Sequence, residues 1–421
     1  MTAQACHGGS EPQWPQIHGL LERAIYGGRV DSAYDVVVLR TYLEQFFSNE
    51  MTGGGGIRQR CLPGTGITLP NSAHHGDYTA MLSELDEANS PSLFSLPVNV
   101  DRTVQVANSK HVITSLRTMA VAAGVASGFD RDAWLAQLQP LLRAWDRLAG
   151  ASPHQRTSRA SAGSLAPGMA GGAQVSTPVD AFVELEKTRG HAAVAAVERT
   201  LSTLGRVLRG TELLTPAVFA AGRVLMEGAV PAGWEKHWEG PEEPMAYCKA
   251  VVHRMSAVIA MAERAKGGEG VLLSKPVRLE DFFHPETFLN ALRQQMAQQA
   301  GVAIDSLVLV TGWGAGAAVA GGAAVEGLRL QGAAFDGTRL ADTASDAPPY
   351  TPLPLCTLAW VVPERPGAGG GAGGGCAPLH LPLYLTPERE RAIADVQFPV
   401  FDAEECSKWV LAGAACFMGA Q

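Results

Sequence analysis

The stretch FFHPETFLNAL, residues 282–292, decides where a central helix of this chain begins. Pro285 suits the first turn of a helix, where its missing N–H is not needed and its fixed φ is already helical. Glu286 follows, and a negative charge is favourable near a helix N-terminus. Four apolar side chains then share one face, because they recur at spacings of three and four. They are Phe288, Leu289, Leu292 and Met296.

Three further helices are predicted upstream of this stretch. Thr177 fits an N-cap, with Pro178 at the first helical position and the acidic Asp180 at the third. A second helix starts at Thr215-Pro216 and ends near Gly228, and a third covers 244–266. The first helix carries an apolar stripe at 3-4-3-4 spacing. Its members are Val194, Val197, Leu201, Leu204 and Leu208.

The N-terminal part of the chain is also predicted to be helical. A helical pair covers 17–47 around the double glycine at 27–28, and further helices are predicted at 78–85, 106–123 and 131–147. A loop is predicted at 91–99. The stretch 149–175 is rich in Ser, Gly, Ala and Pro without periodicity, so we interpret it as a disordered insertion.

After Gly301 the hydrophobic period changes from 3.6 to 2. This predicts six short strands separated by glycine and proline clusters, including the run 367–375. Pro382 cannot donate to a strand ladder, so its strand is expected at an edge or bulged there. Six strands in one terminal block favour a small antiparallel barrel or sandwich. The strands are 307–310, 328–335, 355–362, 379–385, 396–401 and 409–418.

Composition excludes several classes of function. The chain has 421 residues, 46% of them hydrophobic and 18% charged, which is typical of a globular protein with two or three domains. Its net charge of -8 argues against binding nucleic acid or the acidic surface of a microtubule. No apolar run is long enough for a membrane span, and the first residues lack a signal-peptide pattern. The seven scattered cysteines include no C-x-x-C pair, which predicts reduced thiols in a cytosolic protein.

Six phrases of the sequence resemble dynein heavy chains, near their carboxyl end, in the family's order. The central stretch resembles the family signature FNP-x-x-FL. Ser95 departs from the family's usual glycine, and 149–175 and 367–375 resemble insertions. The phrases span nearly the whole chain. They are His18–Asp31, Pro91–Pro97, Leu208–Thr211, Val230–Trp234, Phe282–Leu292 and Trp409–Ala415.

Two further phrases are most similar to the intraflagellar-transport class, cytoplasmic dynein 2. They are Phe288–Gln295 and Leu330–Gly337. The resemblance implies an α+β fold with three parts. Residues 1–105 would end the sixth AAA+ module as its small helical subdomain. Residues 106–300 would form a helical bundle that contains the insertion 149–175, and 301–421 the six-stranded antiparallel β-barrel of the dynein C-terminal domain.

The resemblance also implies a non-catalytic segment that supports or regulates the AAA+ ring of a minus-end-directed microtubule motor. ATP and Mg²⁺ would bind in missing upstream modules, and Met1 would begin an incomplete reading frame. The implied partners are the rest of the heavy-chain ring, the intermediate, light intermediate and light chains, and the microtubule through a missing stalk. No nucleic acid or membrane partner is implied. The implied location is the cytoplasm, the cytoskeleton and the cilium or flagellum.

No catalytic, cofactor-binding or metal-binding residue is expected in this chain. The phosphate loop G-x-x-x-x-G-K-[ST] and the zinc motif H-E-x-x-H are both missing from the sequence. His74 and His75 are adjacent, so they point in different directions and favour a surface loop over a metal site. His284 is interpreted as a residue of the helix start rather than a base. Trp234 and Trp238 are interpreted as packing residues, with a partner-binding surface as the alternative.

Two other patterns have an ordinary structural interpretation beside a functional one. The stripe at 194–208 is short for a coiled coil, so an intramolecular bundle is favoured. The charged run 388–391 is expected to form a solvated turn. A free-standing helical adaptor, binding partners through such apolar stripes, is the alternative to a motor segment.

A glycine-rich turn raises the hypothesis of a nucleotide-dependent oxidoreductase. Strand 307–310 precedes Gly312–Val319, which approximates a Rossmann phosphate turn, and Asp336 lies at a suitable distance to hold a ribose. However, Ala317 or Val319 falls where the third small residue belongs, and Gly321-Gly322 would break the required helix. A glycine-rich connection between strands is therefore the favoured interpretation.

Overall fold

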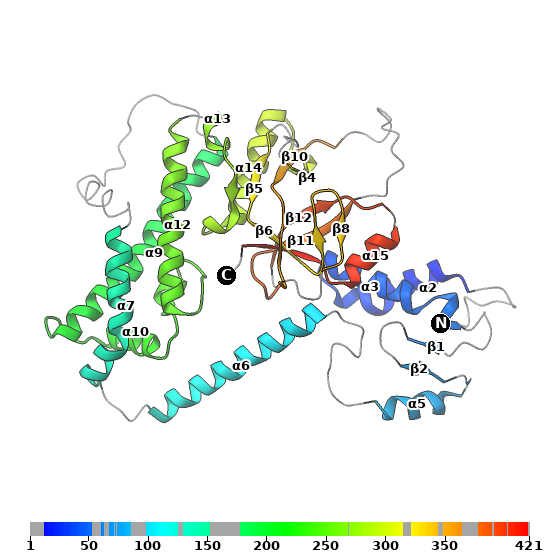
Figure 1. Ribbon diagram of the computed structural model, residues 1–421, viewed down its shortest axis with the longest axis horizontal. Helices are drawn as coiled ribbons and strands as arrows, with labels where there is room; N and C mark the ends of the chain where they lie inside the picture. The colour runs from blue at the N-terminus through cyan, green and yellow to red at the C-terminus, as the bar shows by residue number, and fades with distance from the viewer. Residues whose placement is uncertain are drawn as a thin grey trace. The chain divides into compact units, whose positions relative to one another are not determined.

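The computed structural model describes two compact units of the chain, each formed from separate sequence segments (Figure 1). The first unit contains residues 1–108, 329–354 and 369–421, and the second contains 109–328 and 355–368. Residues 91–97 of the loop predicted at 91–99, most of the insertion at 149–175 and the glycine run at 367–375 lie outside the described residues, whereas residues 98–99 of that loop belong to a helix. The described ranges are 12–52, 60–62, 67–70, 72, 74–85, 98–124, 129–151, 177–267, 269–314, 321–343, 348–363, 378–389, 391–401 and 403–419.

A helical bundle makes up most of the second unit. The helix α9 begins with the predicted capping box, in which the Thr177 hydroxyl accepts from the Asp180 N–H and the Asp180 carboxylate accepts from the Thr177 N–H. It ends at Gly210, whose φ of 77° gives the left-handed cap that glycine favours. Figure 1 shows α9 beside α12. The bundle helices are α7 (Arg131–Ala151), α9 (Pro178–Arg209), α10 (Pro216–Met226), α11 (Ala232–Glu235), α12 (Pro244–Ala265), α13 (Glu269–Leu272) and α14 (Pro285–Ala300).

The predicted helix of the opening stretch is confirmed. The helix α14 starts at Pro285 and ends at Gly301, which again takes a left-handed conformation. Phe288 and Leu292 on its apolar face are fully buried. The starts of α9, α10 and α14 each combine a preceding N-cap position with proline in the first turn. Local sequence signals therefore set the ends of these helices.

The second unit also contains a four-stranded sheet, in the order β3-β5-β10-β4. Strands β4 and β10 are antiparallel and pair from Cys356 opposite Trp313 to Val361 opposite Val308. Strand β5 is antiparallel to β10 but parallel to β3. Helix α14 packs against β10. The strands are β3 (Val277–Arg278), β4 (Val308–Trp313), β5 (Ala323–Glu326) and β10 (Cys356–Val361).

The first unit joins N-terminal helices to a second sheet. The predicted helical pair is present, and between its two helices come a π-helical stretch (η1, Leu21–Tyr26) and a 3₁₀ turn (η2, Gly27–Arg29). Helix α6 begins at Val98, earlier than predicted, and crosses into the second unit. The other elements of this part are α2 (Trp14–Leu20), α3 (Ala33–Phe46), α4 (Asn49–Thr52), β1 (Arg60–Cys61), β2 (Thr68–Leu69), α5 (His75–Ser83) and α6 (Val98–Gly124).

The second sheet has five strands in the order β12-β11-β13-β6-β9. Strand β11 is antiparallel to β12 but parallel to β13. A separate antiparallel hairpin pairs β7 with β8, and helix α15 (Ala403–Leu411) precedes β13. The strands are β6 (Leu328–Gln331), β7 (Ala334–Phe335), β8 (Leu340–Ala341), β9 (Thr351–Pro352), β11 (Leu379–Tyr384), β12 (Ala392–Phe398) and β13 (Ala415–Met418).

The six-stranded antiparallel barrel is not what the described strands form. They form one four-stranded and one five-stranded open sheet and the two-stranded pairs β1–β2 and β7–β8, and the pairs β3–β5 and β11–β13 are parallel. The mixture of helix and sheet was predicted correctly. The predicted strand 328–335 is broken into β6 and β7, because Gly332 has a φ of 82° and turns the chain. The short strands β3 and β5 were not predicted.

The predicted strand 409–418 is wrong over its first part. Residues Ala403–Leu411 form α15, with Glu404 and Glu405 in the first turn and Lys408 in the last. This arrangement of charges complements the helix dipole. Gly413 has a φ of 64°, and only β13 beyond it is extended.

Pro382 lies on β11, between two neighbouring strands rather than at the edge of the sheet. It pairs with Asp395 of β12, and the register shifts one residue later, between Leu383 and Tyr384. Pairing with β13 begins only at Leu383. Proline is therefore tolerated because the parallel neighbour has not yet begun at its position.

Two buried thiols give a testable consequence of this packing. Cys248 and Cys356 are fully buried, and burial raises the pKa of each thiol to about 12. Because the thiolate is the nucleophile, both should stay unlabelled by iodoacetamide in the native protein at mildly alkaline pH. Peptide mass spectrometry checks this, with a guanidinium-denatured sample as the control. Labelling of either residue before unfolding would contradict the packing.

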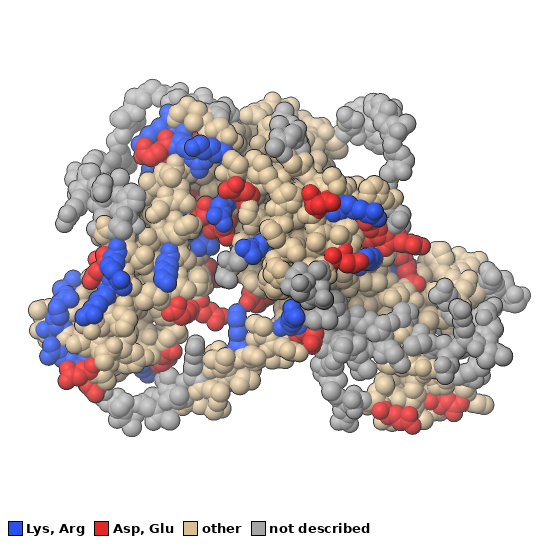
Figure 2. Space-filling view, viewed as in Figure 1, with Lys and Arg blue, Asp and Glu red and all other residues tan. Residues whose placement is uncertain are grey.

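No helix within the described ranges is both long and apolar enough to cross a lipid bilayer. Figure 2 shows acidic and basic side chains interspersed over the visible face, without a broad basic patch. The view agrees with the excess of acidic residues in the sequence. It gives no support to a nucleic-acid-binding surface on that face.

Candidate functional site

The turn that precedes α14 is held by a buried carboxylate from α9. Glu186 is 0% exposed. Its Oε2 accepts hydrogen bonds from the backbone N–H groups of Phe283 at 2.7 Å and His284 at 3.3 Å. Its Oε1 lies 2.9 Å from Nδ1 of His284 and 3.7 Å from Nη1 of Arg189. Glu186 therefore satisfies two backbone donors before α14 that have no partner within the helix.

A second charged side chain holds the same turn from α12. Nε of Arg254 donates to the carbonyl oxygen of Phe282 at 3.0 Å. Its guanidinium group lies 4.4 Å from the ring centroid of Trp238, within the range of a cation–π contact. Burial lowers the pKa of Arg254, while Glu280, Asp281 and Glu186 act in the opposite direction. The turn is thus fixed by an anion on its N–H groups and a cation on a carbonyl group.

Glu186 and Arg254 together hold the turn before α14, and we call this pair the clamp. Aromatic rings pack around the clamp. Phe282 and Phe288 lie 5.1 Å apart, and both lie against Phe182 of α9, at 5.1 and 5.5 Å. Phe283 points to the other side, where its ring meets the Trp238 ring edge to face at 5.5 Å. The two consecutive phenylalanines therefore fill two neighbouring parts of the core. Edge-to-face and tilted pairs at these distances are favourable beyond the burial of their area.

Gly190 leaves the space that Phe283 occupies. A Cβ atom at this position would lie 2.6 Å from Sδ of Met255 and 2.8 Å from a ring carbon of Phe283. We expect Gly190→Ala to lower the free energy of unfolding by about 1–3 kcal/mol, despite the better helix propensity of alanine. Urea unfolding measures the change.

Gly150→Ala in α7 is the matched control. A Cβ there would meet nothing within 4 Å. The control should be neutral or stabilise by up to about 1 kcal/mol. Equal effects of the two substitutions would contradict the close approach at Gly190.

The two tryptophans of the proline-rich turn are packing residues. Trp234 and Trp238 are both buried, and their backbone carbonyl oxygens share the single proton of the Tyr247 hydroxyl, which lies 3.0 Å from each of them. Nε1 of Trp234 donates to Oγ1 of Thr200 at 3.1 Å. The alternative interpretation, in which the two tryptophans form an exposed surface that binds a partner protein, is therefore wrong. The pair instead supports Tyr247 and, through Trp238, the ring of Phe283.

The histidines singled out in the sequence, His74, His75 and His284, do not form a metal or catalytic site. His74 precedes α5 and His75 is its first residue, and both are exposed. His284 precedes Pro285 as predicted for a residue of the helix start, and it contacts Glu186. Across the ranges that the structure describes, no group of three or more His, Cys, Asp or Glu side chains is arranged to hold a metal ion.

The glycine-rich turn lacks the geometry of a nucleotide site in its described part. Gly312 belongs to β4, which pairs antiparallel with β10, whereas a Rossmann turn follows a strand of a parallel sheet. Residues 315–319 lie outside the described residues. Oδ1 of Asp336 accepts from the N–H groups of Thr338 and Arg339, at 2.7 and 2.8 Å. These backbone bonds hold the pKa of Asp336 below its usual range and assign this residue to the β7–β8 turn.

The charged run 388–391 is only partly a solvated turn. Arg389 is shielded by the sheet, and burial lowers its pKa. Its Nη2 donates to Oε1 of Gln331 at 2.7 Å and to the carbonyl oxygen of Gly413 at 2.8 Å. It has a φ of 60°, which is uncommon outside glycine. The prediction was therefore wrong for Arg389, while Glu390 lies outside the described residues.

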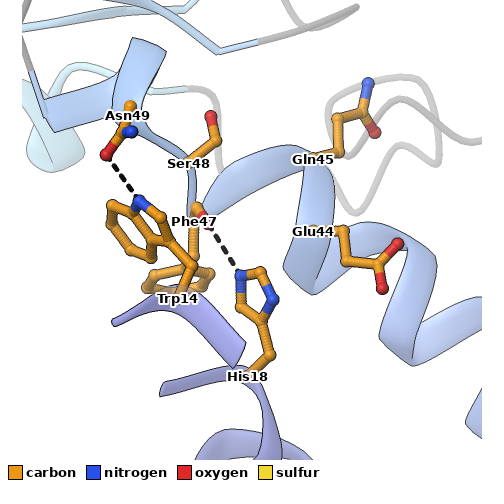
Figure 3. A pocket seen from close by; sticks show the side chains of 7 residues that line it. All are labelled: Trp14, His18, Glu44, Gln45, Phe47, Ser48 and Asn49. Atoms are coloured by element: carbon orange, nitrogen blue, oxygen red, sulfur yellow. Dashed lines mark hydrogen bonds between the residues drawn. The ribbon is translucent and has the colours of Figure 1, made fainter. Parts of the chain in front are cut away.

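An open pocket lies between α2 and the end of α3 (Figure 3). Its volume is about 670 Å³. Nε1 of Trp14 donates to Oδ1 of Asn49 at 2.6 Å, and Nε2 of His18 donates to the carbonyl oxygen of Phe47 at 2.7 Å. These two hydrogen bonds connect α2 to the segment that follows α3. The described lining holds one histidine, one exposed carboxylate, Glu44, and one serine, Ser48, and the hydrogen bond of His18 goes to the backbone rather than to the serine.

Comparison with known proteins assigns nearly the whole chain. Residues 2–100 match the family model of the dynein heavy chain AAA lid domain, and residues 107–418 match the family model of the C-terminal domain of dynein heavy chains. The cytoplasmic dynein 2 heavy chain 1 of Chlamydomonas reinhardtii is 41% identical over 98% of this chain. The proteins of the same name from Tripneustes gratilla and Homo sapiens are 37% and 33% identical over 98% of it.

The chain spans about a tenth of the length of these relatives, 10% of the Chlamydomonas protein and 9% of the other two. The match covers both compact units, including the clamp of Glu186 and the turn before α14. The resemblance inferred from the sequence phrases is thereby confirmed, and the chain belongs to the dynein heavy chain family, with relatives of the cytoplasmic dynein 2 class.

Proposed function

We propose that this chain is a non-catalytic segment of a dynein heavy chain that drives retrograde intraflagellar transport in cilia. Its role is to support and regulate the AAA+ ring of a minus-end-directed microtubule motor. The observation that carries the proposal is the match to cytoplasmic dynein 2 heavy chains over 98% of the chain. An AAA lid followed directly by a C-terminal domain is the order of a ring's last module and its extension.

The clamp before α14 supports the non-catalytic part of the proposal. Glu186 is the most deeply buried carboxylate described, and both of its oxygens are engaged within the protein. A general acid or base must reach a substrate proton, which a carboxylate covered by the turn before α14 does not. The hydrolysis of ATP with Mg²⁺, the microtubule contact and the binding of accessory chains are accordingly assigned to other parts of the heavy chain.

A chimeric motor tests the proposal. The matched region of the Chlamydomonas heavy chain is replaced by this sequence, and the speed of retrograde transport is recorded in flagella of cells that lack their own heavy chain. We expect assembly of flagella and retrograde movement. Glu184→Ala serves as the neutral control variant and Glu186→Ala as the disrupted one. A chimera that is stable and enters flagella without moving cargo backwards would contradict the proposal.

Calorimetric titration of the chain with MgATP and with NAD separates this proposal from the oxidoreductase hypothesis. We expect no binding of either. Micromolar binding of NAD that is lost in Gly314→Ala, with the fold intact by circular dichroism, would favour the oxidoreductase. Binding of MgATP would contradict a segment without a nucleotide site.

A further inference from the structure

The boundary between the lid and the C-terminal domain is not a boundary between compact units. The lid matches residues 2–100 and the C-terminal domain matches residues 107–418. The first compact unit nevertheless unites residues 1–108 with 329–354 and 369–421. The lid is thus packed with the five-stranded sheet that ends the C-terminal domain, and we call this sheet the terminal sheet (β12-β11-β13-β6-β9).

One hydrogen bond joins the start of α3 to strand β12. The hydroxyl of Tyr34 donates to Oδ1 of Asp395, and both side chains are half-buried. Burial and the bond to Asp395 raise the pKa of Tyr34, so its hydroxyl stays protonated and remains a donor at neutral pH. Tyr384 of β11 also acts electrostatically on Tyr34. The first turn of α3 is therefore held against one edge of the terminal sheet, at the edge strand β12 and its neighbour β11.

A second hydrogen bond joins the end of the lid to the turn that leads into β13, the central strand of this sheet. Nδ2 of Asn99, in the first turn of α6, donates to the carbonyl oxygen of Gly413 at 3.2 Å. The same carbonyl oxygen accepts from Arg389, which also holds Gln331 of β6. One backbone oxygen thus links the lid, the turn between β11 and β12, and the centre of the terminal sheet.

Helix packing supplies a third connection. Figure 1 shows α15 next to α3, and the two helices are in contact. Trp409 of α15 is almost fully buried, so α15 is fixed to the unit it belongs to. The lid therefore contacts the terminal sheet at the start of α3 and at the start of α6, and it contacts the helix α15 through α3. Three separated contacts resist rotation, which a single contact would allow.

We infer that the lid helix α3, the start of α6 and the terminal sheet form one cooperative body, locked by the Tyr34–Asp395 hydrogen bond. A displacement of the lid then carries the terminal sheet with it, although the two belong to different family domains. The inference gives the C-terminal domain a direct mechanical input from the lid of the ring. That functional consequence rests on the proposed function, whereas the coupling itself concerns only this polypeptide.

Hydrogen exchange followed by mass spectrometry tests the coupling in the whole chain. The variants are Tyr34→Phe, Asp395→Ala and the double variant, with Asp395→Asn in reserve if Asp395→Ala does not fold. We expect each single variant to accelerate exchange about tenfold in both α3 and β11–β12, the change expected from losing a hydrogen bond to a charged group. The double variant should exchange no faster than either single one, because each removes the same bond.

Tyr42→Phe is the matched control on the same helix. Tyr42 stacks on Phe46 at 5.8 Å, and its hydroxyl has no hydrogen-bond partner among the described residues. Exchange should be unchanged in this variant, and peptides of α9 and α12 give an internal reference in every variant. Acceleration confined to the substituted element, or additive effects in the double variant, would overturn the inference. Exchange needs no motor, so a failed chimera would overturn the proposed function and leave the coupling standing.

Discussion

Replacing Glu186 with alanine should lower the free energy of unfolding by about 3–5 kcal/mol, the largest effect expected from a single charged residue described here. The substitution leaves the N–H groups of Phe283 and His284 buried without acceptors. Each unsatisfied buried donor costs about 1–3 kcal/mol. The imidazole of His284 and the guanidinium group of Arg189 lose their carboxylate as well. Urea unfolding followed by tryptophan fluorescence measures the change, since Trp238 lies beside Phe283.

Two further variants show whether the loss of stability comes from the hydrogen bonds of Glu186 or simply from removing a negative charge. Glu184→Ala removes a carboxylate from the same helix, but that side chain is 66% exposed and forms a surface ion pair with Lys187. Its effect should stay within about 0.5 kcal/mol. Glu186→Gln keeps one acceptor oxygen and should fall between the two. A loss below about 1 kcal/mol in Glu186→Ala would mean that the turn before α14 does not depend on Glu186.

The start of α14 could be predicted from its own residues, but the clamp that holds it could not. Proline in the first turn, an acidic neighbour and an apolar stripe are local signals. Glu186 lies 97 positions before Phe283, in a segment that also contains Glu184 and Arg189. The sequence did contain one indication of the clamp. Glu186 is four residues from both Phe182 and Gly190, so it lies on the same buried face of the helix. A carboxylate on an apolar stripe indicates a buried polar contact.

For the sheets, the sequence predicted where several strands lie but not which strands pair with one another. Apolar patterning predicted β10, β11 and only the last three residues of β12, 396–398, because these segments carry closely spaced buried apolar residues. It does not reveal which strands pair, so the parallel pairs β3–β5 and β11–β13 were missed. Strand β3 has only two residues, too few for a pattern. The end of helix α15 was predicted as a strand because apolar residues gather between Trp409 and Ala415, whereas the acidic residues of its first turn indicate a helix.

Replacing Phe288 with alanine should cost about 3–5 kcal/mol of stability, because it opens a cavity at the centre of the second unit. The side chain is 0% exposed and its ring packs against those of Phe182 and Phe282. These neighbours belong to α9 and to the clamped turn, so neither can move easily into the space. Phe288→Leu keeps most of the volume and should cost less than about 1.5 kcal/mol.

The same substitution tests whether the clamp and the aromatic cluster act together. Leu213→Ala, at a position that is 85% exposed, serves as the surface control and should change stability by no more than about 0.5 kcal/mol. Glu186 and Phe288 hold the same turn from two sides, one through Phe283 and the other through Phe282. Their double variant should therefore be less destabilised than the sum of the single variants, by at least about 0.5 kcal/mol. Strict additivity, or an unchanged unfolding midpoint in Phe288→Ala, would mean that the turn is not a single packed unit, and that the stretch from Phe282 to Leu292 marks only a helix start.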